Sequence, residues 1–392
     1  MPSIPRADAV ALTRALVAID SRNPSLAPGA AGECAVAECL ASVLRDWGCA
    51  VDLLEALPGR PNVIARIGGG HGGRSLMLNG HLDTVGVEGM SHAPFTPDER
   101  DGRLYGRGST DMKAGIAAMC AAAVRAAASG LGGEVVIAAV VDEEFASIGT
   151  RFLLDAGVTA HAAIVTEPTR LAICPAHRGF AWADIIVEGR AAHGSRYDVG
   201  VDAITHAALL LAELDAHQHA VLVPRLHPLL GHASLHAGTI SGGSGISTYP
   251  DRCTFSVERR TLPGESGVDF ARELGDAIAR VRARVPAFRA SVTPGLVQEP
   301  NSVPLDHPLV VALQAACEES GAPAPVEGLS CWTDAALLTA AGIPAICFGP
   351  GDIALAHSTE EYVRIDEITR ATDVLTRFVT AWCGPKGVAW GS

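Results

Sequence analysis

The stretch LMLNGHLDTVG, residues 76–86, begins as a buried strand and ends in two polar side chains. His81 and Asp83 are two residues apart, so in an extended chain they point to the same face. Polar side chains at the end of an apolar run need partners, because burying them without hydrogen bonds costs free energy. We therefore expect other segments of the chain to meet this one.

The composition is that of a globular protein with a large core. The chain has 392 residues, of which 48% are hydrophobic, and this length predicts two domains. The net charge of -13 argues against nucleic acid and anionic membranes as partners, whereas acidic clusters could hold cations. Ten cysteines occur without a CxxC pair, which is typical of free thiols in a reducing compartment.

The amino-terminal segment, MPSIPRADAVALTRALVAID, lacks the charged region followed by an apolar one that is typical of a signal peptide. No apolar run reaches the ~20 residues that a membrane-spanning helix needs. We therefore expect a cytoplasmic protein.

The order of helix-like and strand-like segments predicts a smaller domain inserted into a larger one. Residues 1–179 alternate amphipathic helices with continuous apolar strands such as 134–141, which is typical of an α/β sheet covered by helices. Residues 180–294 change to alternating strands such as 251–260 and amphipathic helices, which predicts an α+β unit with its own core. The first pattern returns over residues 295–392.

Acidic and histidine residues recur where the predicted strands of the larger domain end. Besides the first pair, these residues are Asp111, Glu143, Glu144, Glu167 and, late in the chain, His357. Taken singly, each fits a core histidine, a helix N-cap, a solvated first turn or a loop acid. Ligands of α/β sheets bind at the carboxyl ends of strands, and carboxylates gathered there would repel one another unless cations joined them.

The donor types indicate which metal. Imidazole and carboxylate without thiolate suit zinc, with cobalt and manganese in competition. Five ligands are too many for one tetrahedral zinc, and they suit two ions about 3.5–4 Å apart that share a carboxylate and a water. Asp83 can then accept the second ring proton of His81 and orient it. One of the adjacent Glu143 and Glu144 can bind metal while the other acts as a base.

Five motifs carry a family resemblance: GHLDTV, GRGSTDMKAG, DEE, TEPT and AHSTEEYV, in this order. They resemble those of the zinc-dependent deacylases and exopeptidases typified by acetylornithine deacetylase, succinyl-diaminopimelate desuccinylase, aminoacylase and glutamate carboxypeptidase. The resemblance covers nearly the whole chain, and APFTPDERDGRLYGRGSTDMKAG is its most specific part. It implies a zinc-exopeptidase-like α/β domain, a mixed sheet flanked by helices, with an inserted ferredoxin-like α+β domain that serves as lid and dimerisation domain.

The resemblance also implies two zinc ions per subunit. His81 and Glu167 look like ligands of one ion, and Glu144 and His357 look like ligands of the other. Asp111 looks like the carboxylate that bridges the two.

Three further residues resemble the catalytic residues of this family. Glu143 resembles the general base, and Asp83 resembles the orienting residue. In the inserted domain, His193 of GRAAHGS resembles a histidine that reaches a catalytic site, in dimeric members that of the partner subunit. Its role would be to hydrogen-bond the oxyanion of the tetrahedral intermediate. Without the resemblance, His193 would be interpreted as a loop histidine.

The remaining candidates are residues for substrate binding. In ERRTLPGE, Arg260 aligns with the family arginine that binds the substrate α-carboxylate, a task that suits a planar bidentate donor. Arg259 is the alternative; the two would point to opposite faces of a strand, and a solvated edge-strand charge fits Arg259 better. Ser247 lies in GGSGISTYPD, where many members have asparagine, and Thr333 lies in LSCWTDAALL, which lacks the glycine- and serine-rich run of the desuccinylases.

Together these features predict a metal-dependent amidohydrolase of the deacetylase or desuccinylase type. It would cleave the amide bond of an N-acyl amino acid with a metal-bridging water as nucleophile and Glu143 as general base. The alternatives are a dipeptidase or carboxypeptidase on the same scaffold, an allantoate-type amidohydrolase, and a non-catalytic small-molecule binding protein. The complete ligand set argues against the last of these. The resemblance implies a homodimer formed through the inserted domain.

Overall fold

The chain folds into two compact units in a computed structural model that describes residues 4–69 and 72–384. The larger unit comprises Met1–Pro175, Val303–Glu327 and Thr333–Ser392, and the smaller one comprises Ala176–Ser302 and Gly328–Trp332. The expected insertion at residues 180–294 differs from the smaller unit at both ends. The smaller unit begins four residues earlier, at Ala176. It ends later because the last strand of its sheet runs past residue 294, to Gln298, and a short later segment returns to this unit.

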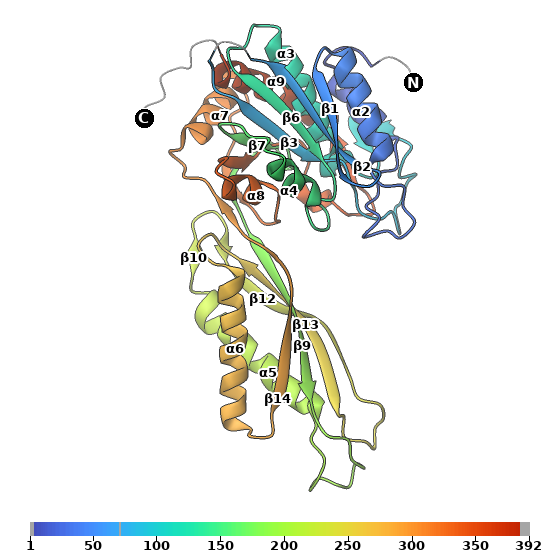
Figure 1. Cartoon of the computed structure of the whole chain (residues 1–392), viewed down its shortest axis with the longest axis vertical. Helices are drawn as coiled ribbons and strands as arrows, with labels where there is room; N and C mark the ends of the chain where they lie inside the picture. Colours follow the sequence, from blue (N-terminus) through green and yellow to red (C-terminus); the bar gives the residue numbers. More distant parts are fainter. Residues whose placement is uncertain (1–3, 70–71, 385–392) are drawn as a thin grey trace. The chain divides into compact units, whose positions relative to one another are not determined.

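A mixed nine-stranded sheet forms the framework of the larger unit (Figure 1). Its strand order is β1-β2-β6-β3-β7-β17-β8-β15, with β16 paired to β8. The strands are β1 (Ala50–Leu57), β2 (Arg60–Gly68), β3 (Leu76–His81), β6 (Glu134–Val140), β7 (Ala163–Val165), β8 (Ile173–His177), β15 (Asn301–Ser302), β16 (Val326–Leu329) and β17 (Ala345–Cys347). Strand β3 pairs in parallel with both β6 and β7, so the carboxyl ends of these three strands meet at one edge of the sheet.

Helices cover this sheet and explain why its central strands are apolar throughout. They are α1 (Ala9–Val17), α2 (Cys34–Asp46), α3 (Ala114–Ala127), α4 (Ile148–Asp155), α7 (Pro308–Glu319), α8 (Ala335–Ala340) and α9 (Ile365–Trp382), with the short η1 (Ser109–Lys113) and η3 (Ile353–Leu355). The alanine-rich α3 is almost wholly buried and packs against α1 and α9. Its small side chains allow neighbouring backbones to approach closely, which fits the high alanine content of the chain.

A small three-stranded sheet links two distant parts of the larger unit. Its order is β18-β5-β4, formed by β4 (Asp98–Arg100), β5 (Arg103–Tyr105) and β18 (Tyr362–Arg364). Because β5 precedes the GRGSTDMK motif and β18 follows the AHSTEE motif, their antiparallel pairing brings these two motifs together.

Apart from the short separate hairpin β10–β11, the smaller unit has the chain order βαββαβ, which confirms the ferredoxin-like prediction. Its antiparallel sheet has the order β12-β13-β9-β14. The elements are β9 (Gly179–Glu188), α5 (Ala203–His217), η2 (Gln218–Leu222), β10 (Leu226–His227), β11 (Gly231–His232), β12 (Ser234–Gly242), β13 (Arg252–Thr261), α6 (Gly267–Arg284) and β14 (Arg289–Gln298). Burial alternates along β9 and β13, because α5 and α6 cover one face of the sheet and leave the other open.

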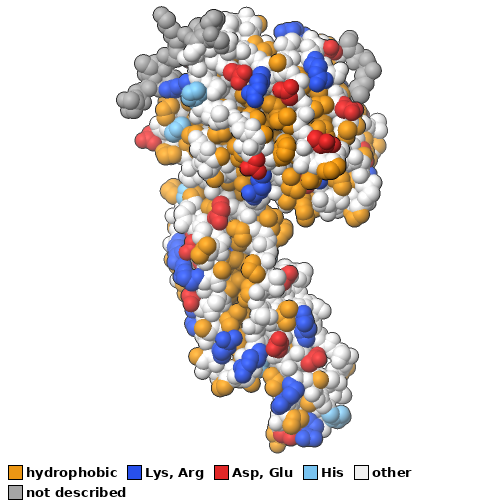
Figure 2. All heavy atoms as spheres, viewed as in Figure 1, with side chains coloured by type: hydrophobic (Ala, Val, Ile, Leu, Met, Phe, Trp, Pro, Cys, Tyr) orange, Lys and Arg blue, Asp and Glu red, His pale blue; other side chains and the backbone are white. Residues whose placement is uncertain are grey.

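Three further features concern the cysteines, the helices and the surface charges. None of the ten cysteines forms a disulfide, and all but Cys34 and Cys331 are buried. Within the described residues, no helix combines the length and apolarity needed to cross a membrane. Acidic and basic side chains are interspersed on the face shown in Figure 2. The cytoplasmic location stays a prediction.

A candidate metal centre and active site

Three neighbouring strands deliver ligand-type side chains to one edge of the large sheet. His81 is the last residue of β3, and it lies opposite Val140, the last residue of β6, in the parallel register. Glu143 and Glu144 follow the end of β6 after two residues, and Glu167 follows the end of β7 after one. The strand-end clustering expected from the sequence is therefore present in the fold.

Asp111 and His357 complete the cluster from the two motifs joined by β5 and β18. The two carboxylate oxygens of Asp111 face different imidazoles: Oδ1 lies 3.0 Å from Nε2 of His81, and Oδ2 lies 3.3 Å from Nε2 of His357. Glu144 lies 2.9 Å from Nε2 of His357 through Oε2. Glu167 Oε1 lies 3.9 Å from Nε2 of His81. Asp111 thus stands between the two histidines, each with its own glutamate.

The cluster offers donors for more than one cation. Donor atoms within 4.8 Å of one another form two sets, which are His81, Asp111 and Glu144, and His81, Glu143 and Glu167. These imidazole and carboxylate donors are of the kind that zinc, cobalt and manganese bind. The residues present fit divalent ions, and they also place Glu143 within reach of the cluster.

Burial makes the charges of this cluster costly. It raises the pKa of Glu143 and of Glu167 well above the ordinary value, and the charges of nearby carboxylates add to that rise. Burial also opposes protonation of His81, but its hydrogen bond to Asp111 and the surrounding carboxylates outweigh this and raise its pKa. Hydrogen bonds to Asp111 and Glu144 raise the pKa of His357 to about 10. The site thus stabilises positive charge, which a divalent cation would supply.

Asp83 orients His81 in a different way from the one expected. Nδ1 of His81 donates to the backbone carbonyl of Asp83 at 2.9 Å, whereas the Asp83 carboxylate lies 3.7 Å from that nitrogen. The carboxylate instead accepts the backbone N–H groups of Glu143 at 3.1 Å and Glu144 at 3.2 Å. It also accepts from Nδ2 of Asn23 at 2.8 Å. The expected hydrogen bond from the ring to the carboxylate is therefore wrong, because the backbone N–H groups of the two glutamates occupy the carboxylate oxygens.

A buried ionic network behind this turn has no signal in the sequence. Asp142, which immediately precedes the glutamates, has a φ of 67° and accepts from both Asn23 and Arg60 at 3.0 Å. Arg60 in turn pairs with the fully buried Glu33. Such a network fixes the turn that presents the glutamates. An arginine at the start of a strand and an acid before a helix are too common to indicate it in advance.

Glu361 holds the loop that presents Asp111. Its buried carboxylate accepts the backbone N–H groups of Gly108 and Thr110 at 3.0 Å and of Asp111 at 3.1 Å. Arg107 neutralises it at 2.6 Å. Gly108 has a φ of +79°, and a Cβ there would lie 2.7 Å from a methyl group of Thr84, so the motif needs glycine at this position. In the sequence, Glu361 is distinguished only as part of the AHSTEEYV motif.

The segment around Thr333 contributes a different residue from the expected one. Thr333 is fully buried, and its hydroxyl contacts Cys347 Sγ at 3.3 Å and accepts the Ala335 N–H. It offers no exposed group to a substrate. The adjacent Asp334 is also buried, accepts from the Thr150 hydroxyl at 2.6 Å and adds to the field that raises the pKa of Glu143. Burial raises the pKa of Asp334 itself to about 6.

Two expected residues of the smaller unit lie on adjoining exposed loops. His193 forms an isolated β-bridge with Thr248, and the N–H of Gly194 donates to the carbonyl of Ser247 at 2.7 Å. The side chain of His193 contacts the Ser195 hydroxyl at 2.8 Å. His193 and Ser247 are therefore held side by side.

The two arginines of ERRTLPGE point to opposite faces of β13, as expected. Arg259 is 1% exposed and pairs at 3.0 Å with both Glu265 and Glu273. The interpretation of Arg259 as a solvated edge-strand charge is wrong, because β13 is an inner strand and α6 covers that face. Arg260 lies on the open face of the sheet, with a third of its side chain exposed.

A mixed α/β sheet with imidazoles and carboxylates at its strand ends, joined to a small antiparallel-sheet unit, defines a class of metal-dependent hydrolases. The profile of peptidase family M20/M25/M40 matches residues 77–381. The chain belongs to this family.

Individual relatives are similar over most of their length. Acetylornithine deacetylase of Myxococcus xanthus is 33% identical over 83% of this chain and 85% of its own. N-formyl-4-amino-5-aminomethyl-2-methylpyrimidine deformylase of Bacillus subtilis is 28% identical over 92% of each chain. Among solved structures, aminopeptidase PepT of Bacillus cereus aligns with a TM-score of 0.79 and 20% identity, over 96% of this chain and 99% of that one. These similarities confirm the fold and the family.

Proposed function

We propose that this protein hydrolyses the amide bond of an N-acyl amino acid. The observation that carries the proposal is the buried strand-end cluster, in which one carboxylate stands between two histidines and a further glutamate lies alongside. The relative named acetylornithine deacetylase supports a deacylase over a peptidase. A dipeptidase or carboxypeptidase is the second candidate, because the fold is shared with an aminopeptidase.

The residues that would hold two zinc ions are those of the cluster. His81 and Glu167 would hold one ion, Glu144 and His357 the other, and Asp111 would be shared. Bound there, divalent ions would polarise the acyl carbonyl and acidify the attacking water. Cobalt or manganese could replace zinc, because the same donors bind them.

Glu143 supplies the proton transfers. Its carboxylate lies in the cluster, and burial together with neighbouring carboxylates raises its pKa, which suits a group that takes and returns a proton. Glu143 removes a proton from the attacking water as the new C–O bond forms. It delivers that proton to the amine nitrogen as the C–N bond breaks, so the products are a carboxylic acid and a free amine.

The smaller unit supplies the remaining groups. In this proposal His193 donates to the oxyanion, Ser247 contributes a hydroxyl beside it, and Arg260 binds the free carboxylate of the substrate. The unit also offers a surface for a homodimer. Strand β12 lies at an edge of the sheet, most of it is exposed, and its Ile240 is 56% exposed. An exposed edge strand of this kind can pair with a second copy of the chain.

A hydrolysis screen with added zinc or cobalt tests the function. N-acetyl, N-succinyl and N-formyl amino acids are compared with dipeptides, and release of the free amine is measured. We expect the highest kcat/KM for an N-acyl amino acid, and loss of turnover after chelation that returns when metal is added. Higher kcat/KM for dipeptides would support the peptidase. Tight binding without turnover of any compound by the metal-loaded protein would support a binding protein.

We expect His193→Ala to lower kcat by ~10²–10³-fold without changing the metal content, which is the usual cost of one lost oxyanion donor. Kinetics and metal analysis of the purified variant check this. The matched control is His219→Ala, which removes an exposed histidine from η2 of the same unit.

Mixing two inactive variants tests whether the partner subunit supplies His193. When His193→Ala and Glu143→Gln subunits exchange, a heterodimer has one site with an intact Glu143 and, from the partner, an intact His193. Activity should then recover toward one working site per dimer. If heterodimers form without recovery, each subunit uses its own His193.

A further inference from the structure

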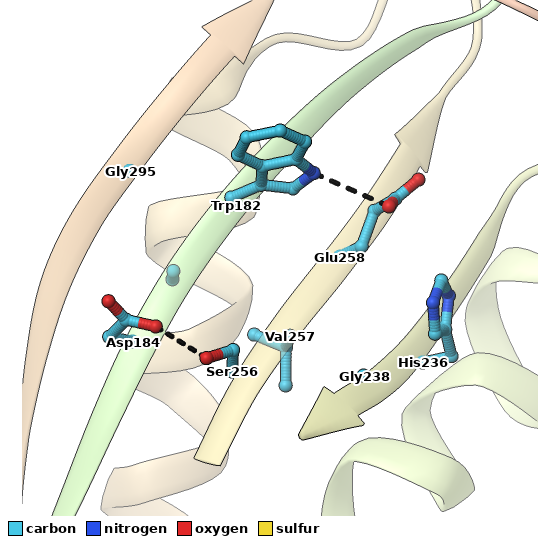
Figure 3. A pocket seen from close by; sticks show the side chains of 9 residues that line it. Trp182, Asp184, His236, Gly238, Ser256, Val257, Glu258 and Gly295 are labelled. Carbon is cyan, nitrogen blue, oxygen red and sulfur yellow. Dashed lines mark hydrogen bonds between the residues drawn. The ribbon is translucent and has the colours of Figure 1, made fainter. Parts of the chain in front are cut away.

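The open face of the smaller unit's sheet bears a ladder of directly opposed side chains. In the antiparallel register of β9 and β13, Arg260 faces Phe180 and Glu258 faces Trp182. The guanidinium of Arg260 lies 5.3 Å above the Phe180 ring, and the rings of Phe180 and Trp182 are 5.0 Å apart. The indole N–H of Trp182 donates to Oε2 of Glu258 at 3.3 Å (Figure 3).

Glu258 joins this ladder to Arg260 by an ion pair in which Nε is the closest guanidinium nitrogen. Its Oε1 forms an ion pair with Nε of Arg260, while its Oε2 accepts from the indole of Trp182. Among the described residues, the two terminal nitrogens of Arg260 make no hydrogen bond. The edge of the guanidinium that can grip a carboxylate with two parallel bonds is therefore free.

We infer that Glu258, fixed by Trp182, is a positioning residue for Arg260 and thereby determines how strongly the protein selects substrates with a free carboxylate. The inference rests on the proposed function, in which Arg260 binds that carboxylate. An arginine side chain has many rotamers, and binding must otherwise restrict them at a cost in affinity. Here the ion pair at Nε and the ring beneath the guanidinium restrict them beforehand.

The opposite role for Glu258 makes an opposite prediction. If Glu258 competed with the substrate for Arg260, its removal would free the guanidinium and lower KM. If Glu258 positions Arg260, its removal raises KM for substrates with a carboxylate. Because Nε of Arg260 is the guanidinium atom closest to Glu258, the ion pair leaves the two terminal nitrogens available to a substrate, and the structure favours positioning.

The same face supplies a matched control. Trp182, Asp184, Ser256 and Glu258 line a groove on this face (Figure 3). Asp184 is the second carboxylate of the groove, and it accepts from the Ser256 hydroxyl at 2.6 Å. Ser256 lies four residues from Arg260 along β13, or about 13 Å, so Asp184 cannot reach the guanidinium. The groove is open to solvent, so shortening Asp184 or Glu258 leaves no sealed cavity in a core.

The test compares N-acetyl-L-ornithine with its carboxamide, which differs only in lacking the carboxylate. If the hydrolysis screen favours another N-acyl amino acid or a dipeptide, that compound and its amide are used. For Glu258→Ala we expect KM for the carboxylate to rise by about 10-fold, the scale of one charge-assisted contact, with kcat within about 3-fold. KM for the carboxamide should stay within about 2-fold. Trp182→Phe, which keeps a ring but removes the N–H, should raise KM for the carboxylate by a smaller factor.

Comparisons among the variants and between the two substrates decide the outcome. Asp184→Ala should leave the ratio of the two KM values unchanged, and Glu258→Asp should restore part of the wild-type ratio. A fall in KM for Glu258→Ala would show competition and overturn the inference. Equal effects on carboxylate and carboxamide, or equal effects of Glu258→Ala and Asp184→Ala, would reduce Glu258 to a structural role and also overturn it.

Calorimetry separates this inference from the proposed function. The carboxylate and the carboxamide are titrated into metal-loaded Glu143→Gln protein, which gives a ratio of their two Kd values. The same ratio is then measured for the double variants that carry Glu258→Ala or Arg260→Ala in addition to Glu143→Gln. Loss of the ratio in Arg260→Ala but not in Glu258→Ala overturns positioning and leaves the proposed role of Arg260 intact. A ratio near one in the parent protein overturns both roles. If the wild-type protein turns over no substrate, but the Kd ratio is lost in both double variants, only the hydrolytic function is overturned.

Discussion

The Asp111→Ala variant should lose both bound metal ions and all measurable hydrolysis. In the unchanged protein, the two carboxylate oxygens of Asp111 lie 3.0 Å and 3.3 Å from the Nε2 atoms of His81 and His357, so this one side chain contacts both halves of the cluster. Removing it takes a ligand from each ion and leaves protein donors too few for either. Metal analysis of the purified variant, together with turnover of the best substrate of the screen, checks this.

Two controls accompany the Asp111 variant. Asp366→Ala removes an exposed carboxylate from the first turn of α9 in the same unit, and it should retain metal and activity. Thermal melting with and without added zinc separates loss of metal from loss of fold, because a bound ion stabilises only the native state. An Asp111→Ala protein with two metal ions and full turnover would remove Asp111 from its proposed role as the shared ligand.

Glu143→Gln and Glu144→Gln should have different defects although the residues are adjacent. Glu143→Gln should retain metal while kcat falls by at least ~100-fold, the usual scale for loss of a general base. Its Oε2 lies 4.0 Å from Nε2 of His81, so the carboxylate is within reach of a water held by the cluster. Glu144 contacts His357 at 2.9 Å, so Glu144→Gln should lose metal. Single-turnover kinetics and metal analysis on the same preparations measure both effects.

The Glu143→Gln and Glu144→Gln variants act as controls for each other, because each replaces one carboxylate oxygen by an NH₂ group within the same turn. The geometry makes the test strict, since Glu143 also stands in one of the two donor sets, with His81 and Glu167. If Glu143→Gln loses metal and Glu144→Gln retains it, the ligand and the base have been exchanged in our assignment.

The sequence predicted the chemical content of the candidate site well. The spacing of GHLDTV, GRGSTDMKAG, DEE, TEPT and AHSTEEYV named the residues that the fold gathers, and the change of pattern after residue 179 predicted the inserted unit. These signals are local: an apolar run followed by a polar pair, and alternation in place of continuous apolar strands. Local signals survive in a single sequence because each depends on neighbouring residues alone.

Other features depended on packing between distant segments. Asp334 enters the field around Glu143 because it is buried beside Thr150, and Glu361 holds the loop of Asp111. Arg259 is a buried ion-paired residue, because α6 brings Glu273 against β13. No periodicity predicts such pairs, since their members are charged residues that would be equally at home in solvent.

By itself, therefore, the sequence determined which donor atoms are available, in what order, and on what kind of framework. Only the tertiary structure decided which of them meet. The parallel pairing of β3 with β6 and β7 aligns three strand ends, and the pairing of β5 with β18 brings Asp111 to His357 across 246 residues of chain, from 111 to 357. The tertiary structure also determines that the Asp83 carboxylate accepts hydrogen bonds from the backbone of Glu143 and Glu144 instead of from the ring of His81. The physical reason is that a hydrogen bond or a shared ligand requires contact within a few ångströms, and the register of distant strands sets that distance.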